Sequence, residues 1–202
     1  NVADMENRGV ELELGYNKKF GDVNFNVSGN LSYLENEVTY LGQGKTYITG
    51  GVGFQSLGTL TRTEIGRPIN TFYGFKTNGI FQNQAEVTSY ANSDGVVIQP
   101  NAKPGDFRWV DTDGDGAITD LDKQYLGSPL PKYTFGLNFG VDYKGFDLSA
   151  SLNGAAGNKI FQGLRRIDIG PYANFQTEAL GRWTGEGTSN SYPRLSIADD
   201  NQ

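Results

Sequence analysis

Two segments of this 202-residue chain alternate apolar and polar residues with a period of two over long stretches. The first is residues 9–33, interrupted only by the Lys-Lys-Phe-Gly-Asp turn at residues 18–22. Its apolar positions are Val10, Leu12, Leu14, Tyr16, Val23, Phe25, Val27, Leu31 and Tyr33. Because successive side chains of a β-strand point to opposite faces, this period predicts a hairpin with strands of about ten residues.

The second alternating segment is residues 132–153. Its apolar positions are Tyr133, Phe135, Leu137, Phe139, Val141, Tyr143, Phe146, Leu148, Ala150 and Leu152. Lys144-Gly145 lies between the two runs and predicts a two-residue turn, because Gly reaches a positive φ easily. The chain is therefore predicted to be all-β and built from antiparallel hairpins.

Two architectures use such hairpins. In a soluble sandwich the strands usually run five or six residues and pack against another sheet. In a transmembrane β-barrel the strands run about 9–11 residues, one face meets lipid, and aromatic residues lie near the strand ends. Tyr16, Tyr33, Tyr133 and Tyr143 occupy such end positions. The pattern favours the barrel and leaves the sandwich open.

On the barrel interpretation, the short turns lie on the periplasmic side and the long connections are extracellular. Residues 1–34 and 132–153 are then barrel hairpins, and residues 154–202 form an extracellular loop region. Residues 35–131 form a loop of about 95 residues, long enough to require its own structure. Four strands are too few to close a barrel, so we expect a fragment of a larger barrel that can pair its strand edges with another copy.

The composition excludes several kinds of site. The chain has no His and no Cys, which removes the usual Ser-His and Cys-His catalytic pairs and most zinc sites. Its net charge of −6 argues against nucleic-acid binding. Glu64, Glu86, Glu178 and Glu186 show no spacing that implies a facing catalytic pair, so we interpret them as surface acids and predict no enzyme.

Residues 111–122 have the sequence Asp-Thr-Asp-Gly-Asp-Gly-Ala-Ile-Thr-Asp-Leu-Asp. The spacing predicts a calcium loop in which the ligands are the side chains of Asp111, Asp113, Asp115 and Asp122 and the carbonyl of Ala117. Calcium would act structurally. Asp122 stands at the twelfth position of the loop, where an EF-hand usually has Glu, and the pattern of residues 107–110 predicts a strand and not a helix. The loop therefore resembles single calcium loops of dockerin type more than a helix–loop–helix EF-hand. A plain Asx- and Gly-rich turn remains the alternative.

Several segments together resemble the SusC/RagA-type TonB-linked outer-membrane receptors of Bacteroidetes. They are Asn-Arg-Gly-Val-Glu-Leu at 7–12, Gly-Arg-Pro-Ile at 66–69, Phe-Tyr-Gly-Phe-Lys-Thr-Asn-Gly-Ile-Phe at 72–81, Pro-Gly-Asp-Phe-Arg at 104–108, Leu-Gly-Ser-Pro-Leu-Pro-Lys-Tyr at 126–133, Tyr-Lys-Gly-Phe-Asp-Leu at 143–148, Gly-Asn-Lys-Ile at 157–160 and Arg-Trp-Thr-Gly-Glu-Gly-Thr-Ser-Asn at 182–190. Their order covers most of the chain.

The resemblance implies a barrel with a plug, located in the outer membrane, which imports glycans or oligosaccharides, or peptides, with a SusD-like surface lipoprotein. Energy would come from TonB through the plug, which this chain lacks. The alternative from another class is a soluble secreted calcium-stabilised carbohydrate-binding module. It predicts a folded monomer with sugar affinity, whereas the receptor interpretation predicts an apolar strand face that needs lipid or self-association.

Overall fold

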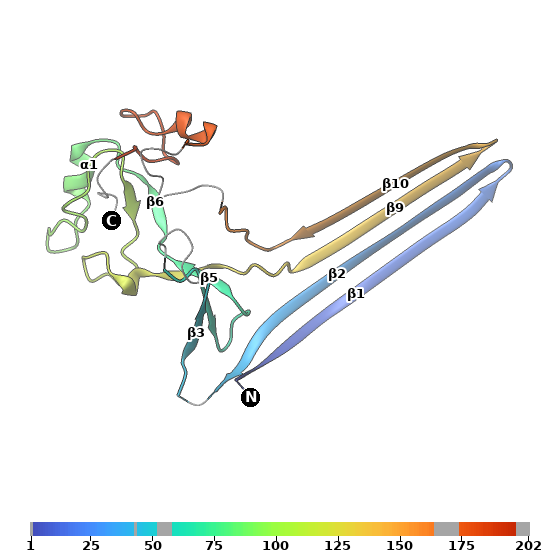
Figure 1. Ribbon diagram of the computed structural model, residues 1–202, viewed down its shortest axis with the longest axis horizontal. Coiled ribbons are helices and arrows are strands. Elements are labelled where there is room, and N and C mark those ends of the chain that lie inside the picture. The colour runs from blue at the N-terminus through green and yellow to red at the C-terminus, as the bar shows by residue number, and fades with distance from the viewer. Residues whose placement is uncertain (1, 43, 52–57, 164–173, 197–202) are drawn as a thin grey trace. The chain divides into compact units, whose positions relative to one another are not determined.

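The computed structural model describes residues 2–42, 44–51, 58–163 and 174–196 (Figure 1). The regular secondary structure of the described chain is almost all antiparallel β, with one short α-helix and two 3-10 turns, which confirms the predicted all-β class. It divides into two compact units. The first unit is Asn1–Val52, Thr59–Phe72 and Gly127–Phe161, and the second is Gly53–Gly58, Tyr73–Leu126 and Gln162–Gln202.

The first unit contains both predicted hairpins. Strand β1 (Ala3–Phe20) pairs with β2 (Val23–Leu41), and β9 (Tyr133–Tyr143) pairs with β10 (Phe146–Ala156). At the second turn Lys144 and Gly145 have φ values of 47° and 88°. Two consecutive positive φ values are those of a type I′ turn, whose twist matches the flanking strands.

The two hairpins join into one sheet with the order β1-β2-β9-β10. Strands β2 and β9 run antiparallel and in continuous register, from Val23 opposite Tyr143 to Tyr33 opposite Tyr133. The four long strands lie side by side in Figure 1. The chain between β2 and β9 therefore leaves the sheet and returns to the neighbouring position.

The sheet has one apolar and one polar face along the paired length. The apolar side chains are largely exposed: Leu12, Leu14, Leu148 and Leu152 are all more than half accessible. On the opposite face, the Asn138 amide donates to Ser28 Oγ at 3.5 Å, and Ser151 Oγ donates to Asn138 Oδ1 at 2.8 Å. The apolar face of the paired length therefore has no packed layer over it in the described part of the chain.

Aromatic pairs lie toward the two ends of the apolar face. Near the turns, the rings of Phe25 and Phe139 pack edge to face at a centroid distance of 5.5 Å. At the opposite end, the rings of Tyr33 and Tyr133 lie 5.2 Å apart. The tyrosine pair lies at the end of the β2–β9 pairing, where interfacial girdles lie in membrane barrels, and the phenylalanine pair lies further inside the apolar face.

Strands β1 and β2 continue beyond Tyr33, although the sequence predicts a loop there. In this extension the apolar side chains change face. Val38 is buried on the face of β2 that carries the polar side chains between residues 24 and 32. Glu35 and Glu37 are exposed on the other face. On β1, the exposed Arg8 Nη2 lies 2.7 Å from Glu6 Oε2. This hydrogen bond holds the pKa of the Glu6 carboxyl below its usual value and raises the pKa of the Arg8 guanidinium.

A segment of the first unit covers the buried face of this extension. The Asn36 amide donates to Asn7 Oδ1 at 2.7 Å, and its Oδ1 accepts from the Ile69 N–H at 2.9 Å. The Val38 N–H donates to the Arg67 carbonyl at 2.9 Å. These bonds explain why the strand continues to Leu41, because the covering segment supplies partners that the local sequence does not show.

Short strands complete the first unit. Strand β3 (Tyr47–Gly50) pairs antiparallel with β4 (Thr61–Glu64), and β4 pairs with the start of β5 (Thr71–Gly74). The guanidinium group of Arg62 lies over the Tyr47 ring at 3.8 Å from its centroid. That contact links β3 and β4 on one face.

The second unit has a small core next to a two-stranded sheet. Its elements are β6 (Thr77–Ile80), α1 (Gln84–Ser89), β7 (Phe107–Trp109), η1 (Asp120–Asp122), β8 (Gln124–Gly127) and η2 (Thr177–Gly181). The last residue of β8, Gly127, is counted with the first unit. Strands β6 and β7 pair antiparallel. Phe81, Val87 and Ala102 form the core, with Tyr90 packed against it. Within the described residues, no helix is both long and apolar enough to cross a membrane.

Candidate functional site

The acidic loop at residues 111–122 follows β7 in the second unit and ends in η1. Asp111, Asp113 and Asp115 each offer a carboxylate oxygen, and these oxygens lie within 4.8 Å of one another. The structure thus brings together three of the predicted ligands. Strand β7 before the loop agrees with the prediction of strand instead of helix at residues 107–110.

Backbone N–H groups hold the carboxylates in place. Asp111 accepts from the Gly114 N–H at 2.7 Å with Oδ1 and from the Gly116 N–H at 3.0 Å with Oδ2. Asp115 Oδ1 accepts from the Ala117 N–H at 2.9 Å. The φ of Gly116 is 87°, and a Cβ there would lie 2.4 Å from Asn92 Nδ2, so both conformation and space require glycine.

Asp122, the fourth predicted side-chain ligand, stands apart from this group of three. It is fully buried. Its Oδ1 accepts from the Thr112 N–H at 2.6 Å, and its Oδ2 accepts from the Thr119 N–H at 2.7 Å. The second bond forms a capping box at the start of η1. Asp122 thus joins the two ends of the loop.

The carbonyl of Ala117 stays a prediction as a ligand. The hydrogen bond of Ala117 to Asp115 uses its N–H and says nothing about its carbonyl oxygen. With one oxygen from each, the three carboxylates supply half or fewer of the six to eight oxygens that Ca²⁺ takes. The same hydrogen bonds are those of successive Asx turns. The geometry is compatible with both interpretations of the loop.

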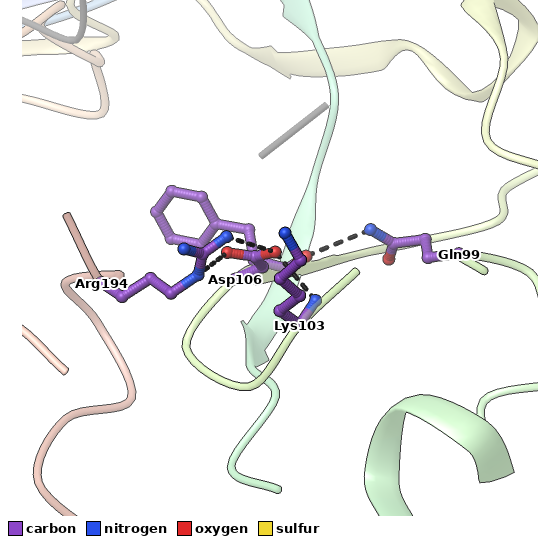
Figure 2. A network of polar contacts seen from close by, with 5 residues as sticks. Gln99, Lys103, Asp106 and Arg194 are labelled. Atoms are coloured by element: carbon purple, nitrogen blue, oxygen red, sulfur yellow. Dashed lines mark hydrogen bonds and ion pairs between the residues drawn. The ribbon is translucent and has the colours of Figure 1, made fainter. Parts of the chain in front are cut away.

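A second polar cluster anchors the chain just before β7 (Figure 2). Arg194 Nε donates to Asp106 Oδ1 at 2.6 Å, and the Lys103 N–H donates to Asp106 Oδ2 at 2.9 Å. The Gln99 amide donates to the Phe107 carbonyl at 3.2 Å and accepts from the Trp109 N–H at 2.8 Å. This cluster positions the strand that leads into the acidic loop.

The second unit also contains an open polar pocket of about 480 Å³. Its lining residues are Ile80, Gln82, Glu86, Arg108, Glu186, Gly187, Ser189 and Asn190. Glu86 and Glu186 were interpreted from the sequence as separate surface acids, and the structure brings both to this pocket. Local sequence contains no signal for this, because 100 residues separate the two segments that meet there.

Gln82 joins those two segments. Its amide nitrogen donates to the carbonyls of Ile80 at 2.9 Å and Ser189 at 3.0 Å. Its amide oxygen accepts from the Gly187 N–H at 2.9 Å and from Trp183 Nε1 at 3.2 Å. All the hydrogen-bonding capacity of this amide is thus spent on fixing the pocket wall.

No protein-family profile matches the chain. The TonB-dependent receptor P26 of Formosa agariphila is 31% identical over 198 residues, which cover 96% of this chain and 19% of that receptor. The TonB-dependent receptor SusC of Bacteroides thetaiotaomicron is 26% identical over 167 residues, which cover 80% of this chain and 15% of SusC. These relatives are receptors, in agreement with the prediction that the chain is not an enzyme.

Solved structures of RagAB are also similar to this chain. A structure described as the RagAB peptide transporter matches 96% of this chain and 20% of its own chain, with 25% identity and a TM-score of 0.67. A RagAB peptide importer in a closed-closed state matches 78% of this chain and 16% of its own, with 27% identity and a TM-score of 0.55. The chain spans about a fifth of the length of the relatives it matches.

Proposed function

We propose that this chain is a piece of a SusC/RagA-type TonB-dependent receptor and serves as part of the outer-membrane barrel and extracellular loops of a nutrient importer. The observation that carries this proposal is the match over 96% of the chain to a receptor sequence and to a transporter structure. The exposed apolar sheet face supports it independently, because a large exposed apolar surface marks a site that contacts a membrane or another protein surface.

The length of the apolar face fits a bilayer. Strands β2 and β9 are paired from Val23–Tyr143 to Tyr33–Tyr133. At roughly 3.4 Å per residue and a tilt of about 45°, these strands span about 24 Å along the membrane normal. Membrane barrels have an apolar band of about 25 Å. Because membrane barrels have their short turns on the periplasmic side and their long loops outside, we assign the two-residue turns to the periplasmic side and the extension of β1 and β2 to the extracellular side.

The partners follow from the same family. We infer a SusD-like surface lipoprotein that captures the ligand, and coupling to TonB through a plug that belongs to the remaining four-fifths of such receptors. Support comes from the similarity to SusC and RagAB. The cargo is an oligosaccharide or a peptide: the resemblance in sequence favours glycans, whereas the similar RagAB structures are of a peptide transporter or importer.

We propose a structural calcium ion for the acidic loop. Asp111, Asp113 and Asp115 bring three negative charges within 4.8 Å, and a divalent cation would offset their repulsion. In the calcium-loaded protein the Ala117 carbonyl and an Asp122 oxygen, which would keep its backbone N–H bond, would add two further ligands, and water would complete the oxygen set. The ion would stiffen an extracellular loop that contacts the lipoprotein or the ligand.

The experiment that tests the function uses bacteria that carry the whole receptor. Uptake of a fluorescent tetrapeptide and of a fluorescent oligosaccharide is compared in the parent strain, a strain lacking the receptor, and the parent strain treated with a protonophore. We expect uptake of one probe that requires both the receptor and the proton-motive force. Uptake unchanged in the deletion strain contradicts the proposal.

The secreted carbohydrate-binding module is distinguished by cell fractionation. The receptor proposal expects this chain to remain with the outer membrane and to need detergent for extraction. The module would appear in the medium and would bind sugar in plain buffer. The exposed Leu12, Leu14, Leu148 and Leu152 on one sheet face favour the first result.

A further inference from the structure

We propose that the polar pocket in the second unit binds a short peptide, with a ligand ammonium group at Glu86 and Glu186 and a ligand carbonyl or carboxylate oxygen at Arg108. The inference deepens the proposed function by naming the class of cargo and rests on it. It starts from the way each lining side chain is fixed and from the charges that the pocket presents.

The two carboxylates of the pocket are each held through one oxygen while the other oxygen stays available. Glu86 Oε2 accepts from the Gln82 N–H at 2.8 Å, and Glu186 Oε1 accepts from the Asn83 amide at 2.6 Å. Within the described part of the chain, the second carboxylate oxygen of each Glu has no hydrogen-bond donor. Both acids are therefore oriented in advance and can still accept a hydrogen bond from a ligand.

The two donor side chains, Arg108 and Asn190, are also held in place and keep N–H groups available for a ligand. Arg108 donates to the Asn78 carbonyl through Nε at 3.2 Å and Nη2 at 2.8 Å, which leaves its Nη1 without an acceptor among the described residues. Asn190 Oδ1 accepts from the Ile80 N–H at 2.9 Å, and its amide N–H groups face no acceptor in the same set. Because these side chains are already ordered, binding costs less conformational entropy.

The charges of the pocket favour a peptide over a neutral glycan. Two carboxylates and one guanidinium give the lining a net charge of −1 from Glu86, Glu186 and Arg108. A peptide terminus or lysine ammonium complements the carboxylates, and a carboxylate or peptide carbonyl complements Arg108. None of the eight residues that line the pocket in the described chain is aromatic, so a sugar ring has no stacking platform there.

The test is calorimetric titration of the whole receptor, purified in detergent, with tetra-alanine, N-acetyl-tetra-alanine and maltoheptaose. The combined substitution Glu86→Gln and Glu186→Gln removes both charges but retains an oxygen that accepts from Gln82 and Asn83. We expect it to raise the Kd of tetra-alanine about tenfold and to change the Kd of the acetylated peptide less than twofold. Arg108→Gln should weaken both peptides.

Matched controls separate the pocket from a general loss of structure. Glu178→Gln removes a surface carboxylate outside the pocket, and Arg182→Gln removes a guanidinium that, like Arg108, donates to a backbone carbonyl, here at 3.2 Å from Ala179 O. Both controls should leave the Kd of tetra-alanine unchanged.

Several results overturn the inference. One is an absence of peptide binding or equal affinity of parent and pocket variants for tetra-alanine. Another is tight maltoheptaose binding that the pocket substitutions weaken. The third is loss of the co-purified lipoprotein without a change in peptide Kd, which would make the pocket a protein-docking site. Energy-dependent peptide uptake combined with unchanged Kd values would refute the pocket and leave the import function intact.

Discussion

The guanidinium group of Arg194 donates two hydrogen bonds to the carboxylate of Asp106, from Nε at 2.6 Å and from Nη2 at 3.3 Å, and thereby joins two segments 88 residues apart. Asp106 is 1% exposed. The Arg194 N–H also donates to the Gly105 carbonyl at 2.9 Å. The C-terminal described segment, which carries half of the pocket lining, is therefore held against the chain before β7 by a buried ion pair.

Replacing Arg194 by Gln is expected to destabilise the second unit by about 3 kcal/mol, because it leaves the buried Asp106 carboxylate without its counter-charge. Hydrogen exchange of the whole receptor should show residues 183–196 opening first. The matched control is Arg8→Gln, whose partner Glu6 is exposed, and it should have little effect. Equal protection in the Arg194 variant and the parent would show that the pair contributes no net stability.

Replacing Asp113 by Asn separates the calcium loop from the plain turn. Asn retains the side-chain oxygen that accepts from the Asp115 N–H at 3.2 Å, so the turn should survive in chelator. The loss of one ligand charge should weaken Ca²⁺ binding at least tenfold, measured by calcium titration of loop protection against protease. If the parent loop shows the same protection with calcium and with chelator, the plain turn is correct.

Replacing Asp122 by Asn is expected to destabilise the loop by about 2 kcal/mol in chelator as well as in calcium. Both carboxylate oxygens accept backbone N–H groups, and an Asn amide would turn a donor toward one of them. Thermal unfolding of the second unit in the two buffers measures this. A loss of stability seen only with calcium would show that the two backbone bonds of Asp122 contribute no stability and that its carboxylate acts through the metal alone.

Substitutions on opposite sheet faces test the membrane assignment. Leu152→Arg places a charge on the apolar face of β10, and Ser151→Arg places the same charge one residue away on the polar face. We expect the first to cost about 2–4 kcal/mol in folding of the whole receptor into lipid vesicles and the second to be tolerated. Similar folding yields for both variants would contradict a lipid-facing apolar side.

The glycine at position 105 tests the packing around the Asp106 anchor. Its φ is 92°, and an added Cβ would lie 2.5 Å from the Trp183 ring. Gly105→Ala should therefore destabilise the second unit by about 1–3 kcal/mol through backbone strain and overpacking. Gly95→Ala is a useful comparison, because its φ is also positive at 79° but nothing lies within 4 Å of the added Cβ. Equal losses in the two variants would show that contact with Trp183 contributes nothing.

Features encoded by neighbouring residues could be read from the sequence. Period-two alternation predicted both hairpins, because side-chain direction in a strand depends only on the residue's place in the repeat. Lys144-Gly145 predicted its own turn, and the spacing of Asp111, Asp113 and Asp115 predicted that their carboxylates would gather. Each of these depends on backbone geometry within a few residues, so the sequence alone determined them.

The tertiary structure decided what depends on distant segments. The pairing of β2 with β9, the continuation of β2 to Leu41 against the segment that contains Ile69, and the pocket that unites Glu86 with Glu186 all require chain parts to meet after long excursions. Asp122 likewise has the spacing of a ligand, yet its place in the fold gives it two backbone N–H donors. Hydrogen-bond partners supplied from elsewhere in the fold cannot be inferred from local periodicity, because they depend on which distant groups burial brings within bonding distance.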